Sequence, residues 1–255
     1  MRRLLIGDKK VRVRDEGEGS RAPVVLVHGA AGSSVAWMDV VRRLAGGPRR
    51  VIAPDLPGHG QSDPWHDVSI DLYRDAVGTI CAQLGVKRAV IVGHSLGGAV
   101  ALRLALGYPD KVAALVLVGT GARLDVDPAL PRALEEDPAR FGELYRRLAF
   151  SPATPVDVVD RWMAVAVQAA PEIAAADFRA ADGFDVRDRL GELRLPTVVV
   201  AGEDDLLVSP RRARELAAGI AHARLVMVPH AGHFVAQERP EDFHAALAGL
   251  LAEVA

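Results

Sequence analysis

The length, composition and charge of the chain limit the classes of protein to which it can belong. With 255 residues, half of them hydrophobic, the chain can bury a sizeable core as one α/β domain. Its formal net charge of −2 argues against nucleic acid or an acidic membrane surface as an obligatory partner, because both would select a basic face. The expected partner is therefore a small molecule that is not polyanionic.

Cysteine usage and the first residues predict a cytoplasmic protein. Cys81 is the only cysteine, so no intrachain disulfide can form, and we expect it to be a small buried apolar residue. Residues 1–10 contain a short apolar stretch, too short for a signal peptide, and no apolar run is long enough to span a membrane. The sequence does not indicate an oligomeric state.

Strands and helices alternate along most of the chain. Val11 and Val13 alternate with arginines, which predicts antiparallel strands at the start of the sheet. Continuous apolar runs predict buried parallel strands at residues 24–27, 51–53, 89–92, 115–118, 198–201 and 225–228. Apolar residues spaced three and four apart predict helices at residues 37–44, 70–84, 96–108, 211–218 and 240–251. This pattern predicts an α/β fold with a doubly wound, mostly parallel sheet.

The alternation stops between residues 123 and 195. Helix starts with proline in the first turn occur at Pro138, Pro155 and Pro171, with no strand between them. We therefore expect a core made of residues 1–122 and 196–255, with residues 123–195 as a helical insertion. Because the insertion follows a strand, it should lie over the carboxyl ends of the strands and form part of a pocket wall.

The most informative motif is the pentapeptide Gly-His-Ser-Leu-Gly at residues 93–97. It lies between a predicted strand and a predicted helix, which is typical of a sharp, strained turn that holds Ser95 at the carboxyl end of the strand. A serine hydroxyl is a poor nucleophile at neutral pH, so it needs an adjacent base and a group that orients this base.

Candidates for the base and for the group that orients it lie in loops that follow later strands. Residues 202–205 read Gly-Glu-Asp-Asp, and residues 231–234 read Ala-Gly-His-Phe. Both loops should meet Ser95 at the same edge of the sheet. The candidate acids are Asp205, Asp204 and the weaker Asp125, and the candidate histidines are His233 and His230.

Two further motifs carry a resemblance to a known family. Residues 28–32 read His-Gly-Ala-Ala-Gly, and residues 55–62 read Asp-Leu-Pro-Gly-His-Gly-Gln-Ser. With these motifs and the order Ser, Asp, His, the chain resembles the α/β hydrolase family over nearly its whole length, in its small, lidded, cofactor-independent form. The resemblance implies an α/β-hydrolase fold in which the insertion is a cap.

The resemblance also implies a role for each site residue. Ser95 is expected to be the nucleophile, His233 the general base and acid, and Asp205 the residue that orients His233. In related chains the acid usually falls three residues after the glycine, which favours Asp205 over Asp204. The Gly-His-aromatic context favours His233 over His230.

The remaining expectations concern the oxyanion hole and the pocket. The backbone N–H groups of Ala30 and Leu96 are the expected oxyanion donors, the latter because it opens a helix. Candidate pocket residues are His28, Gly29, Trp37, His94, Trp162, Met163 and Phe234. The other histidines, His59, His66, His222 and His244, are expected at the surface or in packing. No metal-ligand spacing is present, so we expect no metal and no cofactor.

The predicted function is that of a serine hydrolase, a carboxylesterase that uses water to cleave small to medium esters. Lactone opening, carbon-carbon bond hydrolysis and perhydrolysis use similar triads and stay open as alternatives. A receptor that binds a small molecule without turning it over is an alternative from another class. Ser95 excludes epoxide hydrolases and haloalkane dehalogenases, which need aspartate at this position.

Overall fold

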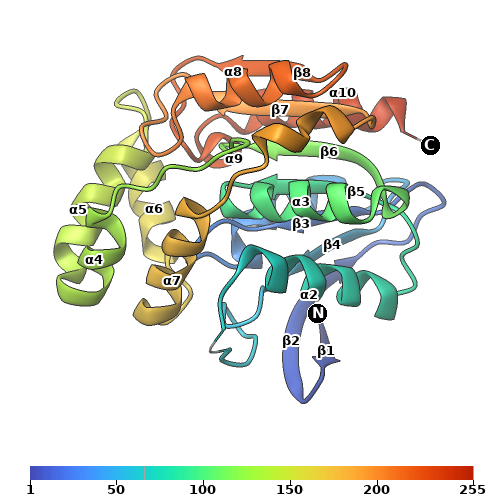
Figure 1. Ribbon diagram of the computed structural model, residues 1–255, viewed down its shortest axis with the longest axis horizontal. Helices are drawn as coiled ribbons and strands as arrows, with labels where there is room; N and C mark the ends of the chain where they lie inside the picture. The colour runs from blue at the N-terminus through green and yellow to red at the C-terminus, as the bar shows by residue number, and fades with distance from the viewer. Residues whose placement is uncertain (66, 255) are drawn as a thin grey trace.

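The strands form one central sheet in the computed structural model, which describes residues 1–65 and 67–254 (Figure 1). The strands are β1 (Arg2–Ile6), β2 (Lys9–Glu16), β3 (Val24–Val27), β4 (Val51–Pro54), β5 (Ala89–His94), β6 (Val112–Val118), β7 (Thr197–Gly202) and β8 (Arg224–Val228). Their spatial order is β1-β2-β4-β3-β5-β6-β7-β8. β1 pairs with β2, and β2 with β4, in antiparallel fashion, while the other pairs are parallel.

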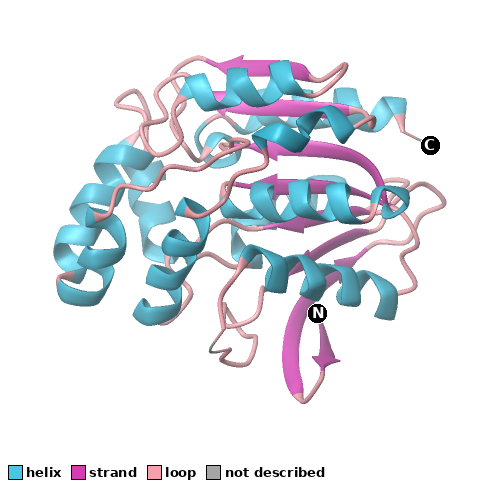
Figure 2. Cartoon of the chain, in the orientation of Figure 1, coloured by secondary structure: helices cyan, strands magenta, loops and turns pink. Residues whose placement is uncertain are grey.

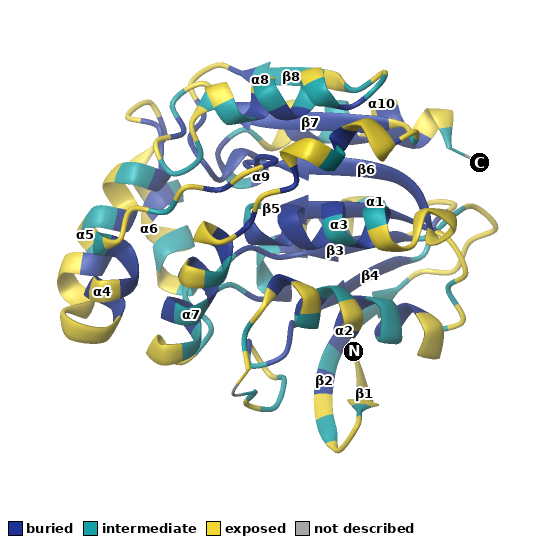
Figure 3. Cartoon of the chain, in the orientation of Figure 1, coloured by how far each residue is buried: buried dark blue, intermediate teal, exposed yellow. Residues whose placement is uncertain are grey.

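The predicted α/β fold with a mostly parallel sheet is therefore confirmed. One strand differs in detail from its prediction, since residues 225–228 were expected to be fully buried. In β8, residues 225–227 are only half-buried, because β8 is an edge strand with β7 as its one neighbour in the sheet. The central strands β3 to β7 are buried throughout, as Figure 3 shows.

Helices cover both faces of the sheet. One face packs against α2 (Ile70–Gln83), α3 (Leu96–Gly107) and α8 (Pro210–Gly219), and the other against α1 (Met38–Leu44) and α10 (Pro240–Glu253). Short helical turns are η1 (Ser34–Trp37), η2 (Pro109–Lys111), η3 (Arg187–Glu192) and α9 (Val235–Glu238). Each face has its own apolar cluster, so the sheet is enclosed on both sides.

Four helices lie between β6 and β7 in the chain: α4 (Ala129–Glu136), α5 (Pro138–Ala149), α6 (Val156–Ala166) and α7 (Pro171–Asp182). They gather on the side of the molecule toward which the parallel strands point (Figure 2). α5 and α7 begin at Pro138 and Pro171, as predicted, and the side chain of Asp137 caps α5 by accepting a hydrogen bond from the N–H of Arg140. These helices enclose a third apolar cluster.

Crossing a membrane would take a longer apolar helix than any of those in the described ranges.

Candidate active site

Ser95 lies at the turn between β5 and α3. Its backbone has φ 54° and ψ −120°, a left-handed conformation that costs free energy for any residue except glycine. Hydrogen bonds hold the turn: the N–H of Ser95 donates to the carbonyl of Val118 (2.9 Å), and its carbonyl accepts from Thr120 Oγ1 (2.9 Å) and from the N–H groups of Gly98 (2.8 Å) and Ala99 (3.2 Å). The surrounding structure therefore imposes the strain, and the serine is partly exposed.

The flanking glycines allow this turn to form. A Cβ atom at Gly93 would collide with the backbone of residues 97–98, and a Cβ atom at Gly97 would collide with the carbonyl oxygens of Val27 and His28. Strand and helix can therefore approach closely only where neither residue has a side chain.

Asp205 and His233 are brought together from the loops after β7 and β8. Both side chains are buried, and the Nδ1 atom of His233 donates to Oδ2 of Asp205 at 2.8 Å. The other oxygen, Oδ1, accepts from the N–H groups of Leu207 and Val208, each at 2.9 Å. The carboxylate is thereby fixed in place, and Nε2 of His233 is left as the nitrogen that can accept a proton.

The competing acids and the competing histidine have other partners or are exposed. Asp204 accepts a hydrogen bond from Ser151 Oγ at 2.6 Å. Asp125 is exposed and forms ion pairs with Arg212 and Arg123. His230 is exposed on the turn after β8. Of the candidate acids, Asp205 is the one that contacts His233.

His94 supports the loop that carries His233. It is buried against His233, with ring centroids 4.6 Å apart, and its Nε2 atom donates to the backbone carbonyl of His233 at 3.0 Å. Burial, and then the neighbouring His233, hold the pKa of His94 well below its usual value of 6.5. His94 is therefore a neutral hydrogen-bond donor.

His28 has a comparable structural role in the loop that contains Ala30. Its Nδ1 atom donates to the carbonyl of Gly29 at 2.8 Å, and its Nε2 atom accepts from the N–H of Leu56 at 3.0 Å. Burial, and then the neighbouring His59, lower the pKa of His28 to about 4. This neutral histidine ties residues 28–32 to the turn that follows β4.

Glu238 is a buried residue near the site that the sequence analysis did not identify. Its carboxylate accepts hydrogen bonds from the N–H groups of Gly232 (3.1 Å), Phe234 (3.0 Å) and Ser151 (2.9 Å) and from the hydroxyl of Thr154. Two of these donors flank His233, and the other two lie between α5 and α6. The local signal was an acidic residue five positions after His233, which by itself does not distinguish a buried carboxylate from a surface one.

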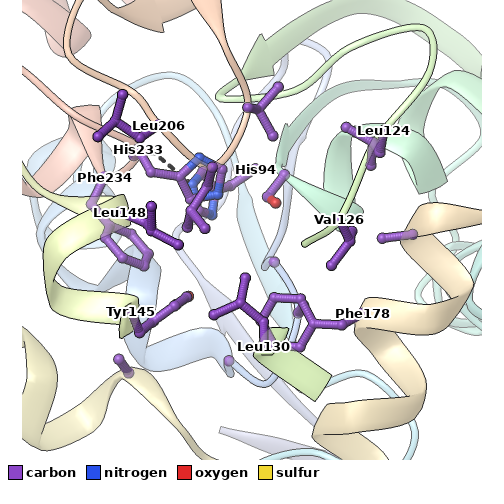
Figure 4. Close-up of a pocket in the computed structure, with 18 of the residues that line it drawn as sticks. His94, Leu124, Val126, Leu130, Tyr145, Leu148, Phe178, Leu206, His233 and Phe234 are labelled. Carbon is purple, nitrogen blue, oxygen red and sulfur yellow. Dashed lines mark hydrogen bonds between the residues drawn. The ribbon is translucent and has the colours of Figure 1, made fainter. Parts of the chain in front are cut away.

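Ser95 and His233 both line one cavity of about 170 Å³, drawn in Figure 4. Its walls are mainly apolar, and Figure 4 shows Leu130 and Phe178 across the cavity from His94 and His233. Neither lysine nor arginine is among the lining residues. The lining includes two exposed carboxylates, those of Asp125 and Asp127.

The candidate pocket residues divide into two groups. Gly29, His94, Trp162 and Phe234 line the cavity, together with Ala30. The predictions for His28, Trp37 and Met163 are corrected, because the cavity lining contains none of them.

Packing accounts for these corrections. The ring of Trp37 is buried against Phe243 on a face of the sheet, 6.0 Å between ring centroids. Met163 packs within the apolar cluster of α4–α7, and His28 is fully buried beneath its loop. Among the aromatic and histidine candidates, His94, Trp162 and Phe234 line the cavity, while His28 and Trp37 are buried in packing.

The remaining histidines differ from one another. His222 is exposed and His244 is half-buried, as expected, while His66 lies outside the described residues. His59, also expected at the surface or in packing, is 1% exposed and pairs with Asp177 at 2.7 Å. A local pattern could not reveal this pair, because its members are 118 residues apart.

The N–H groups of Ala30 and Leu96 are suited to bind an oxyanion. Ala30 lines the cavity, and Leu96 is the first residue of α3, where the helix dipole is positive. Within residues 1–65 and 67–254, neither N–H group donates a hydrogen bond to another group. Both N–H groups can therefore donate to an oxyanion without breaking an existing hydrogen bond.

In the part of the chain that the structure describes, no three His, Cys, Asp or Glu side chains are grouped so that they could hold a metal ion.

Comparisons with known proteins agree with the observed fold. A model of the alpha/beta hydrolase family matches residues 24–246. The chain is 29% identical over 268 aligned residues to 2-hydroxy-6-oxo-6-phenylhexa-2,4-dienoate hydrolase of Comamonas testosteroni, covering 94% of this chain and 90% of that protein.

Two solved structures are similar over almost the whole chain. A thermophilic esterase from Thermogutta terrifontis has a TM-score of 0.87 and 28% identity, covering 96% of this chain and 94% of that one. Est816, described as an N-acyl homoserine lactone degrading enzyme, has a TM-score of 0.85 and 28% identity, covering 97% of this chain and 99% of that one.

Proposed function

The chain belongs to the α/β hydrolase family, and from this premise we propose that it is a serine hydrolase that cleaves carboxylic esters through an acyl-enzyme on Ser95. The observation that carries the proposal is the hydrogen bond between Asp205 and His233, in a cavity that His233 and Ser95 both line. This bond fixes the imidazole as the Nδ1–H tautomer, so Nε2 is free to take the proton of the serine hydroxyl.

The first half-reaction forms the acyl-enzyme. Ser95 Oγ attacks the ester carbonyl as its proton moves to Nε2 of His233, and a tetrahedral intermediate forms. Asp205 stabilises the resulting imidazolium without taking up the proton itself. The intermediate then collapses as the carbon–oxygen bond to the alcohol breaks, and His233 donates its proton to the leaving alkoxide oxygen.

Water completes the cycle. Nε2 of His233 removes a proton from a water molecule, which attacks the acyl carbonyl. The second tetrahedral intermediate releases the carboxylic acid, and the proton returns from His233 to Ser95 Oγ.

The N–H groups of Ala30 and Leu96 stabilise the oxyanion in both intermediates. They are backbone groups held by the fold, so they need little reorganisation as negative charge develops on the carbonyl oxygen. Loss of one such donor typically lowers kcat by about 10²–10³.

Neutral His94 does not oppose the imidazolium that forms on His233 in the proposed mechanism. Its ring lies 4.6 Å from that of His233, so a charge on His94 would oppose the imidazolium that forms during catalysis. The burial that lowers the pKa of His94 prevents this repulsion.

The cavity favours substrates whose acyl part is uncharged and apolar. A carboxylate bound there would lose its hydration without gaining a cation from the lining residues, and Asp125 and Asp127 would repel it. The relative from Comamonas acts on a dienoate, which carries a carboxylate, so this lining supports ester cleavage over that carbon-carbon bond hydrolysis. In this proposal residues 123–195 act as a cap that encloses the acyl group.

Lactone opening is the second candidate. The structural similarity to an N-acyl homoserine lactone degrading enzyme favours it, and its chemistry needs the same attack by Ser95 on an ester carbonyl. The difference lies in the leaving alkoxide, which stays attached to the acyl group.

A substrate panel tests the proposal. Nitrophenyl esters of increasing acyl length, an N-acyl homoserine lactone, an aryl dienoate and a peptide amide are assayed with the wild-type protein and with Ser95→Ala. We expect turnover of short or medium esters that Ser95→Ala abolishes. Tight binding of esters without turnover would indicate a receptor, and turnover of the dienoate alone would indicate a carbon-carbon hydrolase.

A further inference from the structure

A fully buried carboxylate connects residues 123–195, which we call the helical segment, to the loop that contains Ala30. Asp177 belongs to α7 and is 0% exposed. Its Oδ2 atom accepts hydrogen bonds from the N–H of Ala31 (2.8 Å) and from Nε2 of His59 (2.7 Å), and its Oδ1 atom accepts from Tyr73 Oη (2.6 Å). One side chain thus joins α7 to three separate segments of the core.

The charge of Asp177 is balanced by His59. The Nδ1 atom of His59 lies 3.0 Å from the carbonyl of Pro57 and Nε2 lies 2.7 Å from Asp177, so both ring nitrogens face acceptors, as in an imidazolium. Burial opposes this charge, but Asp177, together with the carbonyl of Pro57 and Asp55, outweighs burial and raises the pKa of His59 above 6.5.

The other groups that face His59 do not disturb this pair. His28, whose ring centroid lies 4.9 Å away, has its pKa lowered to about 4 and is neutral at neutral pH. Asp55 adds a second negative charge that favours the imidazolium. Burial and the negative charge of Asp177 raise the pKa of Tyr73, so its hydroxyl remains a donor.

The helical segment holds both backbone groups of Ala31. Its N–H donates to Asp177, and its carbonyl accepts from the N–H of Gln168 at 2.6 Å. Ala31 has φ 60°, in the left-handed region, so without these bonds its backbone would relax. The residue immediately before it is Ala30, whose N–H is an oxyanion donor in the proposed mechanism.

We propose that Asp177 is a positioning residue: by fixing the strained backbone of Ala31, it directs the N–H of Ala30 toward the oxyanion. This inference rests on the proposed function. Asp177 itself is too deeply buried to touch a substrate, and it does not line the cavity. Its effect is therefore specific to tetrahedral states, in which the oxyanion exists, and leaves the binding of the ground-state ester unchanged.

The test compares Asp177→Ala, Asp177→Asn and Val159→Ala with the wild-type protein. For each we measure kcat and KM on the best ester, the affinity for a boronic acid that forms a tetrahedral adduct with Ser95, and thermal unfolding. Val159 is buried in α6, in the apolar cluster that α4–α7 enclose, and it does not line the cavity. Its substitution controls for a general loss of stability in the helical segment.

Asp177→Ala is expected to lower kcat and boronic acid affinity in parallel, each by about a hundredfold, with KM within about twofold of wild type. Asp177→Asn keeps an oxygen that can accept a hydrogen bond from the N–H of Ala31, so kcat and boronic acid affinity should each fall by only about tenfold. This milder variant carries the test if the alanine variant does not fold. Val159→Ala should lower the unfolding temperature while kcat stays within about twofold.

Two results would overturn the inference while leaving the proposed function intact. One is a folded Asp177 variant that keeps wild-type kcat and boronic acid affinity. The other is a raised KM with unchanged kcat, which would make Asp177 part of the pocket wall. If the wild-type protein turned over no ester and bound no boronic acid, the proposed function would fail, and the inference would fall with it.

Discussion

The carboxyl edge of the sheet supplies the site with its polar side chains, whereas the helical segment of residues 123–195 supplies apolar lining and hydrogen bonds to the loops. The loops after β5, β7 and β8 carry Ser95, Asp205 and His233, each within a few residues of its strand. The helical segment contributes the apolar wall and also holds the loops: the N–H of His233 donates to the carbonyl of Ala149 at 2.7 Å.

This difference predicts that substitutions in the two regions change activity in two different ways. In the proposed mechanism, substitutions at the sheet edge remove reacting groups, so they should lower kcat for every substrate. Substitutions in the helical segment, or in the residues that attach it, should change how well those groups are placed or which acyl chains fit.

The largest effect is expected from Asp205→Asn, compared with Asp204→Asn. The amide at position 205 favours the wrong tautomer of His233, so kcat should fall by about 10⁴. Asp204→Asn makes the same change in charge one residue away and keeps an oxygen for the hydroxyl of Ser151, so kcat should stay within about twofold. Steady-state kinetics on one ester distinguish the two, and the reverse result would assign the acid to Asp204.

The next largest effect is expected from Glu238→Gln, because this carboxylate attaches the loop of His233 to the helical segment. Both of its oxygens accept hydrogen bonds from N–H groups, so a glutamine would direct its NH₂ group against a donor. We expect a loss of about 3 kcal/mol in the free energy of unfolding and of about tenfold in kcat.

Glu241→Gln is the matched control for this prediction. Glu241 forms a surface ion pair with Arg43 and is not among the described residues that line the cavity. Its substitution should change the free energy of unfolding by less than about 0.5 kcal/mol. Equal effects in urea titrations of the two variants would show that Glu238 has no special role.

A smaller, selective effect is expected from Phe178→Ala. Phe178 lines the cavity from α7, and its removal should make room for longer acyl chains. The ratio of kcat/KM for a long ester to that for a short one should rise by about tenfold. Val156→Ala, at an exposed position of the same segment, should leave the ratio unchanged, and an unchanged ratio in Phe178→Ala would contradict this account of the wall.

The smallest expected effect is a change of stability with pH. Because the folded state raises the pKa of His59, the pair of His59 and Asp177 contributes fully below pH 6.5 and loses its contribution as pH rises through the raised pKa. The difference in unfolding temperature between wild type and Asp177→Asn should therefore narrow from pH 6 to alkaline pH. A constant difference would show that the pair does not depend on the imidazolium.

The same two regions differ in how far the sequence predicts them. Periodicity and the Gly-x-Ser-x-Gly motif predict the sheet and the position of Ser95, because strand, turn and helix are determined locally. The meeting of the loops after β7 and β8 follows from the parallel strands, which end at one edge. The choice of Asp205 and His233 among the candidates came from the family resemblance, and these two side chains are in contact.

The contacts of the helical segment could not be predicted in this way. Asp177 and His59 are 118 residues apart, and neither has a neighbouring motif that indicates burial. The residue type of Trp37 suggested a pocket wall, but its side chain packs against Phe243 on a face of the sheet, since apolar periodicity does not say against which surface a residue packs. The cavity that Ser95 and His233 line is built from segments far apart in the sequence.

The most direct test of the central claim is covalent labelling of the folded protein with a serine-directed organophosphate, followed by mass spectrometry of its peptides. We predict one adduct, on the peptide that contains Ser95, with no labelling of Ser95→Ala and slow labelling of Asp205→Asn. A folded wild-type protein that stays unlabelled, or that is labelled equally well without Ser95, would contradict the account.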